Sequence, residues 1–237
     1  MSALPPADSV TGVLSARGNV ESVNVAYVRS DLDTRAPDGR TGIDKRPVDG
    51  PVLLTTAGVQ GDTVCHTTHH GGPDQAVYAY AAEDLAFWSA ELGQEVGPGG
   101  VGENLTVSGI DCSAAVLGER WQVGAAVLQV RSTRTPCRVF SAFRGVPDLV
   151  KRFIAAGRPG AYLAVERSGP VQAGDVVTVL DRPGHGVTVA DLMAARTVAR
   201  DRVPVVADAR EHMGARDRDW LDRTVAAMRR TGTAAQA

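Results

Sequence analysis

The sequence predicts a mainly-β domain followed by a small helical region. Short runs rich in β-branched and aromatic residues recur through the first three quarters of the chain, and Gly, Pro or Asp stands at most of the breaks between them. After Pro183 the composition changes to Ala, Arg and Asp, and such runs cease. Many short strands are typical of a β-barrel or a β-sandwich. We therefore expect a flexible tail over residues 1–10, a β domain over 11–183 and a three-helix appendage over 184–231.

Strand-like runs are expected throughout the β domain. Examples are residues 18–28, 52–56, 75–80, 104–107, 121–131, 162–166 and 176–180. Two turns, Gly124-Ala125 and Gly174-Asp175, resemble those of β-hairpins. Helices are expected to interrupt the strands only at residues 83–92 and 147–156. In the first of these, Leu85, Trp88 and Leu92 are spaced i, i+3 and i+7, which places them on one apolar face.

The appendage is expected to contain three helices. Thr188 can cap a helix that runs to Thr197. Pro204 suits the first turn of a second helix ending near Met213, and Asp217 can begin a third that runs to Arg230. The apolar residues of these helices are most simply core residues rather than cofactor contacts.

Composition and charge exclude several classes of protein. The chain has 237 residues, of which 43% are hydrophobic and 22% are charged, and its net charge is −2. These values are typical of a globular protein and carry no basic excess for nucleic-acid binding. No apolar run approaches the roughly 18 residues of a membrane span, and the first residues do not resemble a signal peptide. The three cysteines, at positions 65, 112 and 137, cannot all pair, so we expect reduced thiols and a cytoplasmic location.

Cys137 is the most informative residue. Arg131, Arg134 and Arg138 surround it in the run RSTRTPCR, directly after an apolar stretch. Nearby positive charge favours the thiolate, which is the nucleophilic and metal-binding form of cysteine. Arg134 and Arg138 can equally bind phosphate through their forked donors. The alternative is a buried structural cysteine.

Three loops carry further candidate residues. The run from Cys65 to Asp74 holds three of the five histidines and the pair Gly71-Gly72. Cysteine and imidazole are ordinary zinc ligands, but the other two cysteines lack zinc-site spacing; the glycine pair can instead form an anion-binding turn. A glycine-rich loop over residues 97–104 ends in Glu103-Asn104. In the third loop, the adjacent Lys45 and Arg46 can face either water or a phosphate.

Several familiar catalytic motifs are missing from the sequence. There is no GxSxG, no GxxxxGK[ST] and no GxGxxG between a strand and a helix. Serine hydrolysis, nucleotide hydrolysis and Rossmann-type hydride transfer therefore lack support.

In their order and spacing, these motifs resemble those of the MOSC domain, which is named after the C-terminal domain of molybdenum cofactor sulfurase. More narrowly, the chain is similar to short stand-alone MOSC proteins associated with resistance to N-hydroxylated purine bases. The resemblance rests, in chain order, on Lys45-Arg46-Pro47-Val48, Gly61-Asp62, His70-Gly71-Gly72-Pro73-Asp74-Gln75-Ala76-Val77-Tyr78, Gly102-Glu103-Asn104-Leu105 and Arg134-Thr135-Pro136-Cys137.

This resemblance implies a Greek-key β-barrel of the pyruvate-kinase type and a bound molybdenum cofactor, that is, molybdopterin. Cys137 would bind the molybdenum, which suits a soft thiolate. The residues expected to hold the phosphate and pterin are Lys45, His70, Gly71, Gly72, Asn104, Arg134 and Arg138. His69 is adjacent, so which histidine faces the site stays open.

The activity implied is reduction of N-hydroxylated compounds, such as hydroxylamino purines or amidoxime-like molecules. Three scattered cysteines cannot supply the four thiolates of an iron–sulfur cluster, and no flavin fingerprint is present, so we expect an external flavin or iron–sulfur reductase to donate electrons. Glu103 or Asp74 is the candidate proton donor, with loop hydrogen bonding as the alternative role.

Two other functions stay open. A carrier of molybdenum cofactor, or of sulfur as a persulfide, would use Cys137 without turning over a small molecule. A pyridoxal-phosphate protein needs a Schiff-base lysine, and Lys45 and Lys151 are the only lysines. The appendage can mediate a homodimer, bind the reductase or only cover barrel surface.

Overall fold

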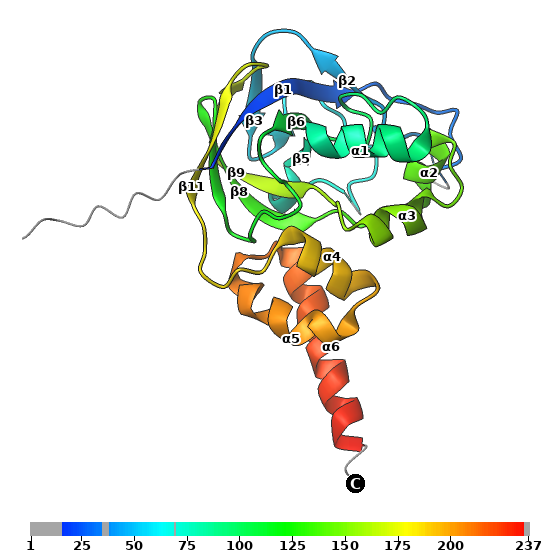
Figure 1. Ribbon diagram of the computed structural model, residues 1–237, viewed down its shortest axis with the longest axis vertical. Helices are drawn as coiled ribbons and strands as arrows, with labels where there is room; N and C mark the ends of the chain where they lie inside the picture. The colour runs from blue at the N-terminus through cyan, green and yellow to red at the C-terminus, as the bar shows by residue number, and fades with distance from the viewer. Residues whose placement is uncertain (1–15, 35–37, 69, 235–237) are drawn as a thin grey trace, which may run out of the picture.

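The structure is a computed structural model that describes residues 16–34, 38–68 and 70–234. Its centre is a closed barrel of seven strands, in the order β11-β7-β8-β9-β5-β6-β1, and β1 pairs with β11 to close the ring (Figure 1). The strands are β1 Arg17–Ala26, β5 Val77–Ala81, β6 Leu105–Ser108, β7 Arg120–Val123, β8 Ala126–Thr133, β9 Ala161–Arg167 and β11 Val176–Asp181. The β5–β6 pair is parallel and the others are antiparallel. The order β11-β7-β8-β9 places the fourth strand beside the first, which is a Greek-key arrangement.

The mainly-β prediction is confirmed, and the choice between barrel and sandwich is resolved in favour of a barrel. Three short strands were not predicted: β2 Lys45–Val48, β4 Gly58–Val59 and β10 Gly169–Val171. Each is two to four residues long, and glycine or proline occurs in all three, so local sequence gives little strand signal. β2 extends the barrel sheet beyond β1, whereas β10 and β4 flank β3 Val52–Thr55 in a separate small sheet.

Helices interrupt the strands more often than expected. The helices α1 Ala82–Leu92 and α3 Leu149–Ala156 agree with the prediction within two residues, but α2 Arg138–Arg144 contradicts the expectation of only two helices. A single 3-10 turn also covers Pro73–Gln75. The helix α2 was missed because it has only seven residues and follows a proline, which usually marks a boundary.

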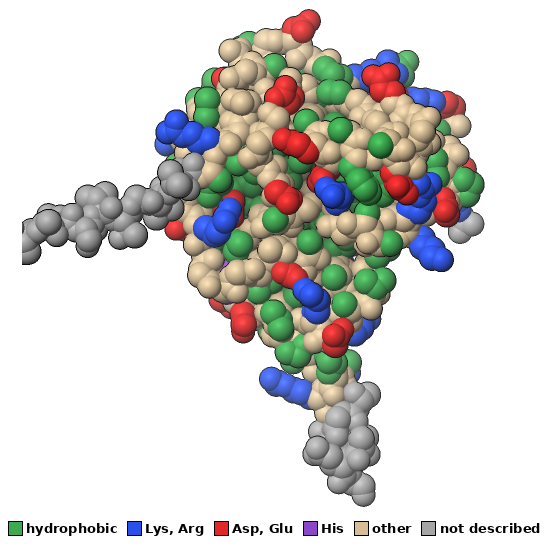
Figure 2. Space-filling view, in the orientation of Figure 1, with side chains coloured by type: hydrophobic (Ala, Val, Ile, Leu, Met, Phe, Trp, Pro, Cys, Tyr) green, Lys and Arg blue, Asp and Glu red, His purple; other side chains and the backbone are tan. Residues whose placement is uncertain are grey.

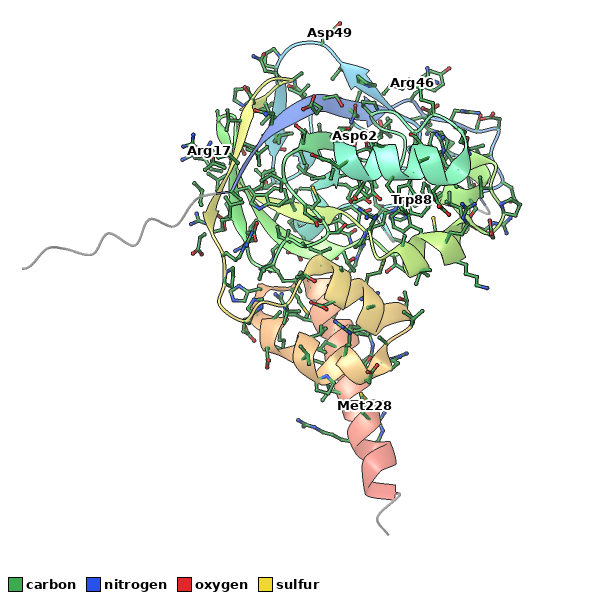
Figure 3. All side chains as sticks on the ribbon, in the orientation of Figure 1. Arg17, Arg46, Asp49, Asp62, Trp88 and Met228 are labelled. Carbon is green, nitrogen blue, oxygen red and sulfur yellow. The ribbon has the colours of Figure 1, made fainter. Side chains whose placement is uncertain are left out.

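Two apolar clusters stabilise the described part of the chain. The first fills the barrel, with Trp121 and Leu128 fully buried, and extends into the C-terminal helices through Leu192 and Leu221. The second is aromatic and lies between the barrel and α1–α3. Its largest members are Tyr78, Tyr80, Trp88, Phe140 and Phe153. The rings of Trp88 and Phe153 stack with centroids 5.5 Å apart, and Figure 3 shows Trp88 on α1.

The C-terminal region is helical, as predicted, and gathers at one end of the barrel (Figure 1). It comprises α4 Val189–Thr197, a 3-10 turn Arg200–Arg202, α5 Val203–Val206, a 3-10 turn Ala207–His212 and α6 Ala215–Ala234. The predicted Thr188 cap is confirmed as a capping box with Asp191. The division into domains at residue 183 stays a prediction, and the proposed tail over residues 1–10 lies outside the described residues.

The face of the molecule in Figure 2 carries basic and acidic side chains scattered among apolar ones, without one dominant charged patch. Within the described residues, no helix combines the length and apolar character needed to cross a membrane.

Candidate functional site

One pocket brings together most of the residues that the sequence singled out. Its empty space is about 860 Å³, a volume that includes space open to solvent. Six of the predicted site residues line it: Lys45, His70, Gly71, Asn104, Arg134 and Cys137. Four others, Gly72, Asp74, Glu103 and Arg138, are not among its lining residues. His69 lies outside the described residues.

Cys137 is placed at the pocket by the loop that follows β8. It is the N-cap residue of α2, with an extended backbone, and its carbonyl accepts a hydrogen bond from the Phe140 N–H at 3.1 Å. The residue is half-buried. Its thiol is therefore accessible from the pocket on a main chain that is held in place.

The three arginines around Cys137 have separate partners. Arg131 pairs with Asp74 at 3.2 Å, and Arg138 pairs with Asp33 at the surface. Arg134 alone of the three lines the pocket. Of Arg134 and Arg138, the two arginines expected to bind a phosphate, the pocket is lined by Arg134 and not by Arg138.

Arg134 is a largely buried cation in the pocket wall. It is 7% exposed, donates a hydrogen bond to the Val101 carbonyl and lies over the ring of Phe140, 4.6 Å from its centroid. A guanidinium stays protonated at all physiological pH values. The pocket therefore has a fixed positive charge on one side, next to the aromatic pair Tyr78 and Tyr162, whose centroids are 4.8 Å apart.

A buried ion pair lines another part of the pocket. The Lys45 ammonium contacts both carboxylate oxygens of Asp62, at 2.6 and 2.5 Å, and the two side chains are only 9% and 8% exposed. Asp62 also accepts hydrogen bonds from the Asn104 amide at 2.8 Å and from the Ala26 N–H at 2.8 Å. Figure 3 shows Asp62 within the outline of the barrel and Arg46 at its outer edge.

The electrostatics of this pair follow from burial and mutual attraction. Burial lowers the pKa of Lys45 below its usual value, although Asp62 opposes that shift. Burial acts to raise the pKa of Asp62, but the charge and hydrogen bonds of Lys45 and the Asn104 amide outweigh it, so this pKa lies below the usual value. The carboxylate is thus ionised at neutral pH.

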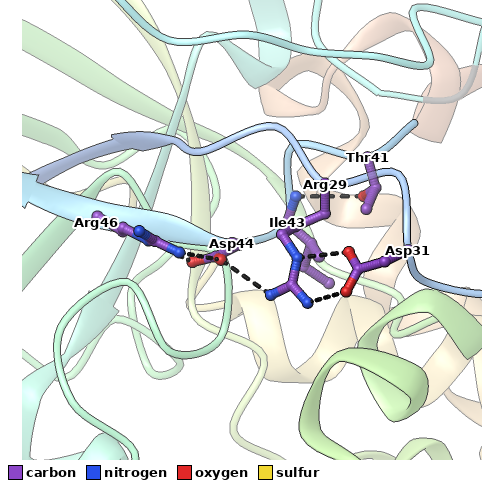
Figure 4. A network of polar contacts seen from close by, with 6 residues as sticks. All are labelled: Arg29, Asp31, Thr41, Ile43, Asp44 and Arg46. Carbon is purple, nitrogen blue, oxygen red and sulfur yellow. Dashed lines mark hydrogen bonds and ion pairs between the residues drawn. The ribbon is translucent and has the colours of Figure 1, made fainter.

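A polar network fixes the chain segment that leads to Lys45 (Figure 4). Arg29 donates to Asp31 at 2.6 Å and to Asp44 at 3.2 Å, and Arg46 donates to Asp44 at 2.9 Å. The backbones of Arg29 and Thr41 exchange hydrogen bonds at 2.9 and 2.8 Å. Because Thr41 and Lys45 line the pocket, this network holds one of its walls.

Glu103 lies beneath the glycine-rich loop. Its carboxylate is fully buried and accepts hydrogen bonds from the N–H groups of Gly99 at 2.6 Å and Val101 at 3.1 Å, and from the Thr106 hydroxyl at 2.9 Å. Burial raises its pKa. These contacts shape the loop that carries Gly102 and Asn104 into the pocket wall.

Gly99 has the tightest fit in this loop. Its φ is +79°, and a Cβ there would lie 2.1 Å from the Lys45 carbonyl oxygen. We expect Gly99→Ala to lower the free energy of unfolding by about 3 kcal/mol, because the side chain would displace β2.

Gly93→Ala is the matched control. Gly93 also has a positive φ, +61°, but nothing lies within 4 Å of its Cβ position, so a loss of about 1 kcal/mol is expected. Urea denaturation measures both, and equal losses would contradict the steric argument.

The pocket also contains residues to which the sequence assigned no role. Asp62, Tyr78 and Tyr162 line it, and so does Cys65, which appeared only as a possible zinc ligand. Asp62 and Tyr78 stood in motifs of the resemblance, and this was the available signal for both. Burial raises the pKa of the Cys65 thiol. Among the described residues, no group of three or more His, Cys, Asp or Glu side chains is arranged to hold a metal ion.

Comparisons with known sequences agree with the motif order. The family model "MOSC domain" matches residues 66–178. YflK of Bacillus subtilis, described as uncharacterized, is 35% identical over 149 residues, which is 63% of this chain and 67% of that protein. YiiM of Escherichia coli is 31% identical over 163 residues, 67% of this chain and 72% of that protein. A Gibberella moniliformis protein named "Reductase" is 32% identical over 147 residues, but these are only 26% of its length.

Solved structures show the same fold. YiiM from Geobacillus stearothermophilus superposes with a TM-score of 0.72 at 25% identity, over 87% of this chain and 98% of that one. YiiM from Escherichia coli gives a TM-score of 0.67 at 24% identity, over 87% and 91% of the two chains.

Proposed function

Because the chain belongs to the MOSC domain family, we propose that it binds molybdenum cofactor and reduces N-hydroxylated compounds with electrons from a separate reductase. The observation that carries this proposal is the half-buried Cys137 thiol in a pocket that also holds Arg134 and Lys45. A name that indicates reduction, "Reductase", belongs to a fungal relative that matches over part of its length. The substrates proposed are hydroxylamino purines and amidoxime-like molecules.

The donor set of the pocket fits such a cofactor. A thiolate is a soft ligand suited to a sulfur-rich metal centre. Cys137 would supply one ligand to the metal, and the dithiolene sulfurs of molybdopterin would supply others. When bound, the cofactor supplies the two electrons that cleavage of an N–O bond requires.

In this proposal, the side chains that line the pocket bind the cofactor and orient it. We assign Arg134, Asn104, His70 and Gly71 to holding the anionic and polar parts of the cofactor, because all four line the pocket with Cys137. Tyr162 offers an aromatic face on which a planar heterocycle can stack. Lys45 is held by Asp62 and cannot move freely toward a phosphate.

Lys45 lines the pocket, but its ammonium contacts both oxygens of Asp62, so we propose that it stays charged and acts electrostatically. The protons for N–O cleavage then come from solvent that reaches the open side of the pocket. Glu103 and Asp74, the donors expected from the sequence, have other partners: Glu103 is enclosed by loop N–H groups, and Asp74 binds Arg131 and the Ala215 N–H. We propose structural roles for both.

The test is to purify the protein from cells that make molybdenum cofactor, measure molybdenum per chain, and assay reduction of a hydroxylamino purine with a reduced viologen. Bound molybdenum together with reduction supports the proposal. Bound molybdenum without reduction of several N-hydroxylated substrates would instead favour a cofactor carrier. Absence of molybdenum from the wild-type protein would rule out both the molybdenum-dependent reductase and the cofactor carrier.

A further inference from the structure

One wall of the pocket is a loop with little regular structure of its own. We call residues 65–68 and 70–75 the histidine loop. Five of its members line the pocket: Cys65, His66, His70, Gly71 and Gln75. Gly71 and Gly72 have φ values of +72° and +85°, a backbone conformation that glycine adopts freely. Such a loop needs contacts from outside to keep one shape.

The first turn of α6 provides those contacts. The Arg216 guanidinium donates to the Thr67 carbonyl at 3.2 Å and reaches the Gln75 side-chain oxygen at 3.5 Å. Thr67 is two residues from Cys65, and Gln75 lies at the other end of the loop. One side chain from the C-terminal helices therefore bridges both ends of the pocket wall.

Asp74 makes a second connection. Its carboxylate accepts hydrogen bonds from the Ala215 N–H at 2.8 Å and from the Arg131 Nε at 3.2 Å. Arg131 in turn donates to the Met213 carbonyl at 2.8 Å. Gly214 fits closely against this group, because a Cβ there would lie 2.8 Å from the Asp74 Cβ.

The start of α6 is itself anchored to the barrel. Asp217, which is 4% exposed, accepts hydrogen bonds from the Ser132 hydroxyl of β8 at 2.5 Å and from Arg196 of α4 at 2.5 Å. The histidine loop is thus held by α6, and α6 is in turn held to β8 of the barrel through Asp217.

We propose that the helical appendage is part of the functional site, with Arg216 and Asp74 as positioning residues that hold the histidine loop in the shape of the pocket wall. The inference goes beyond the proposed function, because it concerns the wall itself and applies to any ligand of the pocket. It also gives Asp74 a role other than proton donation.

Two cysteines on different walls make a direct test possible. Cys65 belongs to the histidine loop and Cys137 to the start of α2, and both are half-buried, while Cys112 is fully buried in the barrel core. We expect Arg216→Ala to raise the rate of iodoacetamide labelling of Cys65 by roughly threefold or more at about pH 8, because local opening of the loop becomes easier. The rates at Cys137 and Cys112 should not change. Mass spectrometry of the labelled peptides resolves the three sites.

The controls separate positioning from general destabilisation. Arg223→Ala removes an exposed arginine farther along the same helix and should leave Cys65 labelling unchanged. Arg216→Lys should restore part of the wild-type protection, and Asp74→Asn should weaken it, since Arg131 would lose its charged partner. An unchanged Cys65 rate in Arg216→Ala would overturn the proposal, and so would an equal rise at Cys65 and either other cysteine.

A second readout connects the inference to the proposed function. In protein from cells that make molybdenum cofactor, Arg216→Ala should retain several-fold less molybdenum than Arg223→Ala. If wild-type protein holds none, the proposed function fails, while the labelling experiment still decides whether the appendage positions the loop.

Discussion

Cys137→Ser is expected to reduce bound molybdenum from about one atom per chain to background, because a hydroxyl cannot replace a soft thiolate as a ligand. The substitution nearly preserves side-chain volume, and Cys137 caps α2 through its backbone and not its thiol, so the fold should persist. Elemental analysis of protein from cofactor-producing cells gives the molybdenum content, and reduction of a hydroxylamino purine should be lost in parallel.

Cys65→Ser is the matched control for this experiment. Cys65 lines the same pocket on the histidine loop, so the substitution changes the same atom type at a comparable degree of burial. It should keep most of the molybdenum. Equal molybdenum in wild-type protein and Cys137→Ser would refute the ligand assignment. Equal loss in both variants would attribute binding to the shape of the pocket and not to one thiol.

Asp62→Ala is expected to lower the free energy of unfolding by about 3–5 kcal/mol, because it leaves the buried Lys45 ammonium without its counter-charge. The Ala26 N–H and the Asn104 amide also lose an acceptor. The loss should shrink as pH rises toward 10.5, the ordinary pKa of a lysine, because the ammonium of the unfolded chain then deprotonates as well. Urea denaturation at several pH values measures both effects.

Two further variants test the cause of that loss. The double variant Lys45→Met with Asp62→Leu removes both charges and should recover much of the stability. Asp31→Ala breaks an ion pair of Arg29 in which Asp31 is 62% exposed, and it should leave the free energy of unfolding nearly unchanged because solvent screens the pair. An equally small change for Asp62→Ala would show that the buried pair does not stabilise the fold as argued.

The sequence predicted those parts of the fold that depend on residues close together in the chain. Glycine-punctuated apolar runs identified most barrel strands, and Thr188 marked the start of α4. Closure of the barrel was not visible in any local pattern, because it depends on Arg17 pairing with Thr178 at the far end of the β region. The short strands β2, β4 and β10 exist because neighbouring strands pair with them and not because their own residues favour extension.

For the candidate site too, the sequence predicted some features and not others. Motif order brought Cys137, Arg134, Asn104 and Lys45 to one pocket, as the resemblance implied. The pairing of Lys45 with Asp62 could not be read from one sequence, since it depends on the path of the loop between β4 and the pocket. Glu103 and Asp74 seemed available as acids because loops are usually exposed, yet both bind backbone N–H groups.

Closure of the barrel by β1 and β11 also sets the order in which the chain can fold during synthesis. The β1 strand begins at Arg17, but its partner β11 starts only at Val176, so the ring stays open until most of the chain has left the ribosome. Until then β7 and the first residues of β1, Arg17–Asn19, present unpaired edges, which are the kind of surface through which nascent chains aggregate. The C-terminal helices come after β11 in the chain, so they leave the ribosome only after the strand that completes the ring.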